Sequence, residues 1–341
     1  MEPMASREEI SPSPPAPEPP RIDEPLPPRV NLAAFRLAAL GLALVLTLSI
    51  TMVRLFVGGP PSVEELRRQA GVDNWSELAI GVKDDQPGTA IRNADGTWSG
   101  FDIAIAYMIA EDLGFRRSEV KFYAMESEDR VRMQATDTAQ RRVPVKLVIA
   151  SYSITADREA KAGVTFSAPY LYTEQSVLTL KGYPKVSALE DLKGREVCTL
   201  SASTSQAAPR DAGAVVRRKN RVSECIADLR AGTVDAVSTD AAILAGFKAQ
   251  APDEFEHWDL GLDNTEAWGI NVGENQALKT LVDLTLYRSL KDPADDRWEL
   301  AYEGNLQAEQ PANGTTPIAQ AQQPDVEKPE VKEQPWESVI P

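Results

Sequence analysis

The chain has 341 residues, of which 43% are hydrophobic, enough for one large core or two medium ones. Its formal net charge is −15, which argues against nucleic-acid binding, because that function needs a basic face. One histidine (His257) and two cysteines exclude most metal sites and most histidine-dependent catalysis. We therefore expect no metal and no other cofactor, and we expect His257 to be a surface or packing residue.

Residues 1–32 are rich in proline, with ten prolines among scattered Glu and Arg. Such a segment cannot bury enough apolar surface to offset the entropy lost on ordering, so we predict a disordered or polyproline-like arm. We favour the role of a plain spacer. The alternative is that its Pro-x-x-Pro spacings dock in an aromatic groove of a partner.

An apolar stretch, residues 33–57, follows the arm. Positions 37–53 are seventeen uncharged, mostly apolar residues, and Arg36 and Arg54 at its ends can reach lipid headgroups. Residues 56–61 offer no small-residue cleavage site, so we predict a retained transmembrane anchor and not a signal peptide. A buried core helix is the alternative. Arginines on both sides leave the orientation undecided from flanking charge.

Strands and helices alternate after a linker over residues 58–73. The first cycle is predicted as strand 77–82, helix 100–113, strand 120–124, helix 127–140 and strand 146–151. The second cycle is predicted as strand 195–200, helix 223–232, strand 234–240 and helix 241–250. This alternation predicts mostly parallel sheets covered by helices. Residues 306–341 again combine Pro, Gln, Glu and Lys without periodicity, and we predict a disordered tail.

The two cysteines lie in different predicted elements, Cys198 in a strand and Cys225 in a helix. A bond between them would stabilise the fold by about 3–4 kcal/mol in the chain-entropy model. It would also place residues 71 onward outside the cytosol, since disulfides persist in oxidising compartments. We expect this bond, with two unpaired core thiols as the alternative. The N-terminus would then be cytosolic and the large domain extracytoplasmic.

Polar residues follow three of the predicted strands, at the carboxyl ends where ligands bind in α/β sheets. They are Arg158 with Ser151, Ser153 and Thr155 after one strand, residues 201–205 after a second and Asp240 at the end of a third. A cation with hydroxyls at one place and a carboxylate at another match a zwitterion. Each also has an ordinary structural role, Arg158 as a surface ion pair and Asp240 and Ser203 as helix caps.

The chain resembles bacterial family-3 extracellular solute-binding proteins, the polar amino-acid receptors of ABC importers, over residues 76–305. The resemblance rests on the ordered segments DDQPG, NADGTWSGFDIAIAYMIAEDLGF, SYSITADREAKAGVTFSAPY, CTLSASTS and AGTVDAVSTDAAILAGF. It implies an α/β fold of the two-lobed type II periplasmic-binding-protein kind, with a solute-binding domain over 74–305. The implied segments are lobe 1 over about 74–175 and 275–304, lobe 2 over about 183–264, and hinges near 173–182 and 265–274. The lobes would close over a ligand.

The same resemblance implies the ligand contacts. The carboxylate-binding arginine falls on Arg158, assisted by Ser151 and Ser153, and the ammonium-binding aspartate falls on Asp240. The other implied contacts are Ser203 and Thr204 in a turn and Asp84, Ser127 and Arg130 along the side-chain pocket. The cysteine positions and the segment STDAAILAG point to the glutamate/aspartate-type subgroup.

Three features depart from the family pattern. Lys146 stands where members usually carry an aspartate, Ala202 replaces a common glycine, and a retained membrane helix replaces the usual lipid-modified cysteine. The first two put the neighbouring loop and the close approach of backbone to ligand in doubt. None of them removes Arg158 or Asp240.

We therefore expect a monomeric, membrane-anchored receptor that delivers an amino acid to an ABC permease and is not an enzyme. Glutamate or aspartate is favoured, glutamine or asparagine comes next, and an apolar ligand is disfavoured because a second arginine in the cleft would stay unpaired. Two alternatives remain open: a sensor or assembly subunit that uses the same cleft, or a dehydratase-like enzyme on this fold. An enzyme would need a poised acid or base, for which Glu128, Asp129 and Asp84 are candidates.

Overall fold

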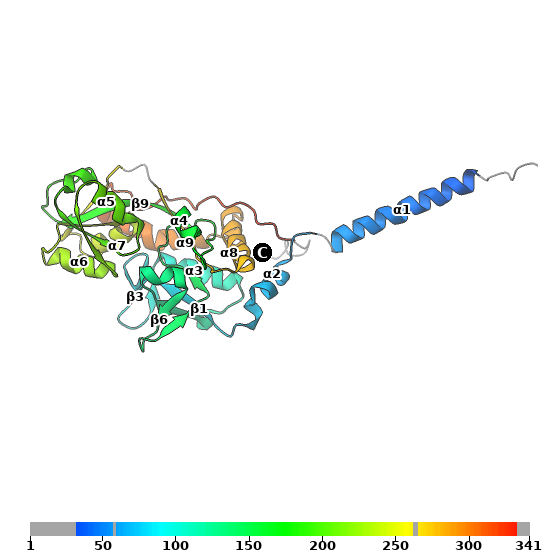
Figure 1. Ribbon diagram of the computed structural model, residues 1–341, viewed down its shortest axis with the longest axis horizontal. Helices are drawn as coiled ribbons and strands as arrows, with labels where there is room; N and C mark the ends of the chain where they lie inside the picture. The colour runs from blue at the N-terminus through cyan, green and yellow to red at the C-terminus, as the bar shows by residue number, and fades with distance from the viewer. Residues whose placement is uncertain (1–31, 57–58, 262–264, 333–341) are drawn as a thin grey trace, which may run out of the picture. The chain divides into compact units, whose positions relative to one another are not determined.

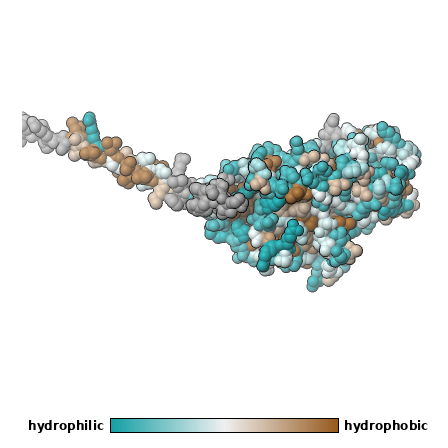
Figure 2. Space-filling view, turned by 180° about the vertical axis from the view of Figure 1, so that it is seen from behind, coloured by the Kyte–Doolittle hydropathy of each residue, from teal (hydrophilic) through white to brown (hydrophobic). Residues whose placement is uncertain are grey.

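In the computed structural model, residues 32–56, 59–261 and 265–332 are described, and the chain divides into two units at residue 60. The first unit contains helix α1 (Leu32–Phe56), whose segment Leu32–Met52 has a mean hydropathy of 2.0. Its length and composition suit it to cross a membrane, as predicted, and apolar residues run along it in Figure 2. The predicted proline-rich arm lies outside the described residues, apart from Leu32.

The second unit has two α/β lobes (Figure 1). Lobe 1 is built on a sheet of strand order β7-β6-β5-β1-β8, in which β1 pairs in parallel with β5 and β8. The strands are β1 (Leu78–Val82), β5 (Val120–Ala124), β6 (Gln134–Thr136), β7 (Arg142–Pro144) and β8 (Leu147–Val148). The longer helices are α2 (Val63–Ala70), α3 (Phe101–Asp112), α8 (Gln276–Lys291) and α9 (Arg297–Tyr302). Parallel pairing at the centre of the sheet brings the carboxyl ends of β1 and β8 to the same edge.

Lobe 2 is built on a sheet of strand order β11-β10-β12-β9-β13. The strands are β9 (Leu171–Leu180), β10 (Glu196–Leu200), β11 (Val215–Lys219), β12 (Ala236–Asp240) and β13 (Phe255–Trp258). The helices are α5 (Ala207–Asp211), α6 (Val222–Arg230) and α7 (Ala241–Gln250). Strands β10, β11 and β12 are parallel, whereas β9 is antiparallel to β12 and β13, so the sheet is mixed.

Two extended segments connect the lobes. Strand β9 pairs antiparallel with β14 (Thr265–Trp268), in a register that runs from Leu171↔Trp268 to Glu174↔Thr265. The chain after β14 then returns to lobe 1, where Asn271 bridges to Val148 and Phe166. This pair of crossings is the two-hinge connection that the sequence predicts.

A small sheet, β2 (Asp85–Gln86), β3 (Ala90–Arg92) and β4 (Trp98–Ser99), leads into α3. Gly100 precedes this helix with φ of +122°, and a Cβ there would lie 2.3 Å from the carbonyl oxygen of Thr89. Only glycine fits this turn. The turn sets α3 against the loop that follows β1, which borders the cleft described below.

The structure differs from the predicted helix over residues 127–140. A 3-10 turn covers Ser127–Arg132, Met133 takes φ of 52°, and a β6–β7 hairpin follows. The Asp137 carboxylate accepts hydrogen bonds from the backbone N–H groups of Ala139 and Arg141 at 2.8 Å each, which favours a tight turn over a helix.

The structure also differs from the expected linker and tail. Helix α2 occupies residues 63–70 of the predicted linker, begins at the cap Ser62 and buries Leu66 and Ala70. After α9, helix α10 (Ala308–Asn313) and an extended segment to residue 332 lie on the second unit. Ile318, Val326 and Val331 are buried there, so a composition typical of disorder still contains enough spaced apolar residues to anchor the segment.

Candidate functional site

A cleft between the lobes gathers residues from the carboxyl ends of β1, β8, β10 and β12. The cavity left between the closed walls has a volume of about 10 Å³, and its lining residues are Lys83, Gln86, Ser127, Arg130, Ser151, Ser153, Arg158, Leu200, Ser203, Thr204, Thr239, Asp240 and Ile243. Eight of the nine predicted ligand contacts are in this set, and Asp84 is not. The lining residues run from Lys83 to Ile243 in the sequence, and the fold brings them together at the strand ends, where ligands bind in α/β sheets.

Arg158 lies in the short helix α4 (Ala156–Glu159), whose N-cap Thr155 accepts a hydrogen bond from the Arg158 backbone N–H. Its guanidinium donates to the carbonyl of Ser153 at 2.6 Å and to the carbonyl of Ala202 at 3.0 Å, and it lies 4.7 Å from the ring centre of Tyr152. Burial lowers its pKa, but an arginine stays charged. The described contacts use two of its five N–H donors, which leaves donors for an anion.

Arg130 is more fully engaged. It donates to the carbonyls of Ser127, Ala150, Ser151 and Ala202 at 2.9–3.2 Å, and it also lies over Tyr152, at 4.4 Å. Burial, and then the charge of Arg158, lower its pKa to about 9. Among the described residues it keeps one N–H donor free of a protein acceptor.

Asp240 ends β12 and stands at the N-cap position of α7. Its carboxylate accepts hydrogen bonds from Trp268 Nε1 at 2.6 Å and from Ser205 Oγ at 3.3 Å. Burial, with the nearby charge of Glu266, raises its pKa to about 7. A carboxylate held in this way is stabilised in its charged form when a cation arrives.

The smaller side chains complete the two walls. Ser153 Oγ lies 3.5 Å from Thr204 Oγ1 across the cleft, and Ser203 Oγ donates to the carbonyl of Leu200 at 2.7 Å. Ser151 has φ of 47°, and its Oγ donates to Gln86 Oε1 at 2.9 Å.

Ser151 is held in this conformation by Asp102, which the sequence analysis missed. Asp102 is fully buried in α3 and accepts hydrogen bonds from the Ser151 backbone N–H at 3.0 Å and from Tyr170 Oη at 2.9 Å. Burial raises the pKa of Asp102 to about 7. The available signal was the position of Asp102 inside the apolar run FDIAIAYMIA. A carboxylate buried with such a run needs hydrogen-bond partners.

Lys83 was also missed. It follows β1 directly, is 3% exposed, and donates from Nζ to Ser127 Oγ at 2.8 Å. Burial, and then the charge of Arg130, lower its pKa to about 7. The available signal was its position: Lys83 is a cation directly after the predicted strand 77–82. Ser151 and Asp240 were predicted as ligand contacts from the same kind of position, at the carboxyl end of a strand.

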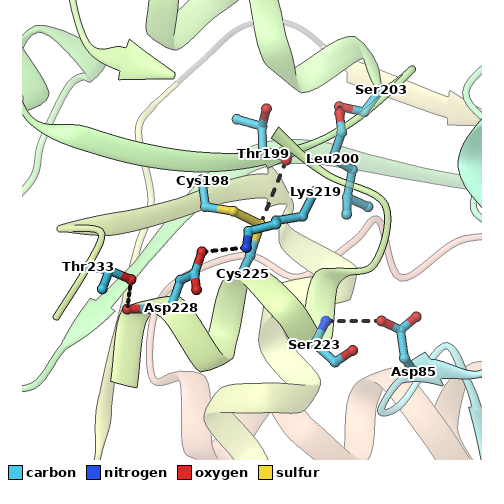
Figure 3. The surroundings of a disulfide bond; sticks show 10 residues. All are labelled: Asp85, Cys198, Thr199, Leu200, Ser203, Lys219, Ser223, Cys225, Asp228 and Thr233. Carbon is cyan, nitrogen blue, oxygen red and sulfur yellow. Dashed lines mark hydrogen bonds and ion pairs between the residues drawn. A yellow bond between two sulfur atoms is a disulfide. The ribbon is translucent and has the colours of Figure 1, made fainter. Parts of the chain in front are cut away.

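The two lobes touch across the cleft, so the structure is closed. Both cleft arginines of lobe 1 donate to the carbonyl of Ala202 in lobe 2. Asp84 pairs with Arg221 of lobe 2 at 2.8 Å, and beside it Asp85 Oδ2 accepts the Ser223 backbone N–H at the start of α6 (Figure 3). Asp84 therefore lies in an interlobe ion pair, beside a separate surface hollow lined by Arg92, Trp98 and Arg221.

The predicted disulfide is confirmed: Cys198 of β10 is bonded to Cys225 of α6, with a Cα–Cα distance of 5.5 Å (Figure 3). The bond links β10, whose carboxyl end lies at the cleft, to α6, whose first turn donates a backbone N–H to Asp85. His257 is a buried packing residue, hydrogen-bonded to Ser176 and Asn313 at 2.7 Å each. Among the described residues there is no group of three or more His, Cys, Asp or Glu that could hold a metal ion.

Comparison with known proteins identifies the fold. Bacterial extracellular solute-binding proteins, family 3, match residues 78–292. The glutamate-binding protein GluB of Corynebacterium efficiens is 30% identical over 241 residues, covering 67% of this chain and 79% of that protein. The ABC transporter glutamine-binding protein GlnH of Bacillus subtilis is 31% identical over 230 residues, covering 65% of this chain and 80% of that protein.

Among solved structures, an ancestral arginine-binding protein bound to glutamine superposes with a TM-score of 0.58 at 29% identity, covering 67% of this chain and 97% of that one. The family match covers most of the second unit. It agrees with the two-lobed architecture and with the cleft at the strand ends. The chain belongs to family 3 of the bacterial extracellular solute-binding proteins.

Proposed function

We propose that this protein binds a polar amino acid, glutamate or aspartate in first place and glutamine or asparagine next, and delivers it to an ABC permease. One observation carries the proposal: Arg158 from lobe 1 and Asp240 from lobe 2 line the same closed cleft. A guanidinium pairs with a carboxylate through charge-assisted hydrogen bonds, and a buried carboxylate pairs with an ammonium. Together they recognise the part that all α-amino acids share.

The surrounding groups support these roles. Arg158 has N–H donors left for a ligand. Its guanidinium is already held by contacts with Ser153 and Tyr152, so ligand binding costs little further side-chain entropy. Ser151, Ser153, Ser203 and Thr204 add hydroxyls around the ligand, and Asp240 accepts the ammonium. Relatives named as glutamate- and glutamine-binding proteins support a polar ligand.

We further propose that α1 anchors the protein with the N-terminal arm in the cytosol and the second unit outside. The disulfide supports this orientation, because such bonds persist in oxidising compartments. A receptor fixed beside its permease by α1 would release its ligand where it is taken up.

A thermal-shift screen of the full chain in detergent micelles against the twenty amino acids tests the ligand class. We expect glutamate and aspartate to raise the melting temperature most, glutamine and asparagine less, and leucine and phenylalanine not at all. A ligand at a thousand times its Kd stabilises by about 4.1 kcal/mol, which such a screen detects easily. An Arg158→Ala chain is the matched control and should show no shift. A folded wild-type chain that no amino acid stabilises would contradict the proposal.

A further inference from the structure

Lys83 is a buried cation with few partners. Its ammonium has three N–H donors, and among the described residues the only acceptor it reaches is Ser127 Oγ, at 2.8 Å. It is 3% exposed, so water does not replace the missing partners freely. A buried charge in this state is unfavourable until an opposite charge pairs with it.

The two carboxylates that raise the pKa of Lys83 electrostatically, Asp84 and Asp85, are already engaged. Asp84 pairs with Arg221 at 2.8 Å, and Asp85 Oδ2 accepts the Ser223 backbone N–H at 3.0 Å. Both carboxylates influence Lys83 only through space. The missing partner of Lys83 must therefore come from whatever fills the cleft.

The charges of the cleft point to the same partner. Its lining contains three cationic side chains, Lys83, Arg130 and Arg158, against one carboxylate, Asp240. A zwitterion with a neutral side chain would leave this excess of positive charge unchanged. A second carboxylate on the ligand would reduce it.

Arg130, the side-chain contact that the family resemblance implies, is the less suitable receptor. Its donors are directed at four backbone carbonyls, so it holds together the 3-10 turn, the β8 end and the Ala202 turn. Lys83 keeps two donors and can reorient on a flexible stem.

We propose that Lys83 is the specificity-determining residue of this receptor and that its ammonium, steadied by Ser127, binds the side-chain carboxylate of the ligand. This inference rests on the proposed amino-acid-binding function and deepens it: the residue selects an acidic side chain over its amide. A lysine at this position distinguishes glutamate from glutamine by charge, since the two have nearly the same shape.

Titration calorimetry of the full chain in detergent with glutamate and with glutamine tests this inference. Lys83→Met keeps the length of the side chain and removes the charge, and Lys121→Met on the exposed face of β5 is the matched control. We expect Lys83→Met to weaken glutamate by about 100-fold and glutamine by less than about threefold. The control should bind both ligands like the wild type.

Each outcome has a separate meaning. Equal loss of both ligands in Lys83→Met, or no loss of either, overturns the role of Lys83 and leaves the proposed function standing. A wild-type chain that binds neither ligand overturns the proposed function itself. A higher melting temperature of unliganded Lys83→Met, in which the unpaired ammonium is gone, would show that the variant is folded and would support the inference.

The C-terminal strap, defined as residues 308–332, contacts both lobes. One end of the strap is hydrogen-bonded to lobe 2. Asn313 Oδ1 lies 2.7 Å from His257 Nδ1, and Asn313 Nδ2 donates to the carbonyl of Ala245. Thr316 Oγ1 donates to the carbonyl of His257. Asn313 and Thr316 are themselves buried.

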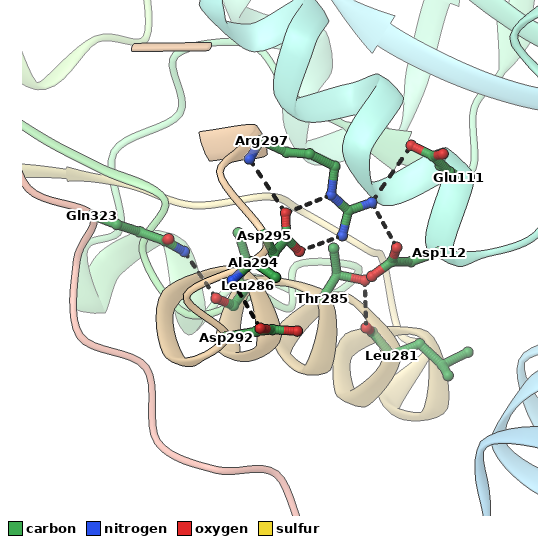
Figure 4. Close-up of polar contacts among 10 residues, drawn as sticks. All are labelled: Glu111, Asp112, Leu281, Thr285, Leu286, Asp292, Ala294, Asp295, Arg297 and Gln323. Atoms are coloured by element: carbon green, nitrogen blue, oxygen red, sulfur yellow. Dashed lines mark hydrogen bonds and ion pairs between the residues drawn. The ribbon is translucent and has the colours of Figure 1, made fainter. Parts of the chain in front are cut away.

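The strap then crosses the connection between the lobes and reaches lobe 1. Thr173 of β9 donates to the carbonyl of Ile318 at 2.7 Å, and the Gln320 N–H donates to the carbonyl of Tyr172 at 2.8 Å. Gln323 donates to the carbonyl of Leu286 in α8 at 2.8 Å (Figure 4).

The far end of the strap reaches the start of the second unit. The Lys332 N–H donates to the carbonyl of Pro61 at 2.9 Å, next to the cap of α2. Figure 1 shows this red segment running along the second unit.

We infer that the strap restrains the hinge and favours the closed lobes. Its two ends are bonded to different lobes, so rotation of the lobes would stretch it or break the bonds at one end. A restraint of this kind raises the closed fraction of the unliganded protein, and the apparent affinity for a ligand that binds the closed form rises in proportion.

Distance measurements between dyes on Lys121→Cys in lobe 1 and Lys185→Cys in lobe 2 test the strap, since both native cysteines are bonded. The test variant is Gln320→Pro, which removes the N–H that donates to Tyr172, and the control is Gln322→Pro at an exposed strap position. We expect Gln320→Pro to lengthen the mean distance without ligand and to weaken glutamate and glutamine alike by a few fold. A stop after Asn313 should lengthen it further. An unchanged distance in both variants would overturn the inference.

Discussion

The guanidinium of Arg158 in lobe 1 donates a 3.0 Å hydrogen bond to the backbone carbonyl of Ala202 in lobe 2. Arg130 donates to the same carbonyl at 3.2 Å, so one backbone oxygen of lobe 2 accepts from both cleft arginines. Ala202 has φ of 54°, which directs its peptide in a way that few non-glycine residues adopt. The closed cleft is thus held partly by Arg158, the proposed receptor of the ligand α-carboxylate.

Replacing Arg158 by alanine should abolish tight binding of every amino acid. The change removes the proposed receptor of the α-carboxylate, and charge-assisted pairs of this kind are worth about 3–4 kcal/mol, which is roughly 100- to 1,000-fold in Kd. Calorimetry with glutamate and glutamine measures it. An Arg158→Ala chain that binds either ligand as tightly as the wild type would remove Arg158 from the site.

Replacing Arg130 by alanine should weaken glutamate and glutamine to a similar extent. Its guanidinium serves four backbone carbonyls, and those acceptors lose their partners whichever ligand is present. Calorimetry with glutamate and glutamine on Arg130→Ala and on Lys83→Met compares the loss of affinity for each ligand in the two variants. If Arg130→Ala loses affinity for glutamate but not for glutamine, Arg130 binds the side-chain carboxylate, as the family resemblance implies.

The sequence predicted the parts of this molecule that depend on local pattern and on topology. The strands that become β8 and β12 were readable from apolar runs, although β8 ends at Val148, three residues before the predicted end, and parallel pairing brings the carboxyl ends of neighbouring strands to one edge of a sheet. The roles of Asp102 and Lys83 were not readable in the same way, because burial of a charge depends on which neighbours cover it. The strap was missed for a related reason: Ile318, Val326 and Val331 are too widely spaced to give a periodic signal, yet each finds a site on the folded surface.

Reduction of the Cys198–Cys225 bond should lower stability without unfolding the second unit. The bond spans 27 residues, for which the chain-entropy model gives about 3–4 kcal/mol. Lobe 2 keeps its buried apolar residues after reduction, so the loss should appear as a lower melting temperature of a still cooperative transition. Differential scanning calorimetry with and without reductant measures it, and a Cys198→Ser/Cys225→Ser chain should melt like the reduced wild type. An unchanged melting temperature would show that the bond contributes nothing.

Acidification should destabilise the protein through His257. Burial lowers the pKa of this histidine to about 4, while in the unfolded chain it titrates near 6.5. Between those values His257 binds more protons in the unfolded state than in the folded state, so the contribution of this residue to stability is fully present above pH 6.5 and is lost as the pH drops towards 4. The slope is about 1.4 kcal/mol per pH unit, or roughly 3 kcal/mol in all. A His257→Gln chain lacks this titration, and denaturant unfolding from pH 7 to pH 4 should show a smaller loss for it than for the wild type.

Protease treatment of intact spheroplasts should cut the second unit and spare a tag at the N-terminus. The expectation follows from an apolar helix long enough to span a membrane and from a disulfide that persists outside the cytosol. Immunoblots against the tag and against the second unit measure both sides in one sample, and detergent-permeabilised spheroplasts supply the control in which both epitopes are lost. If the second unit is protected and the tag is removed, the anchor has the opposite orientation, and the cleft of Arg158 and Asp240 faces the cytosol.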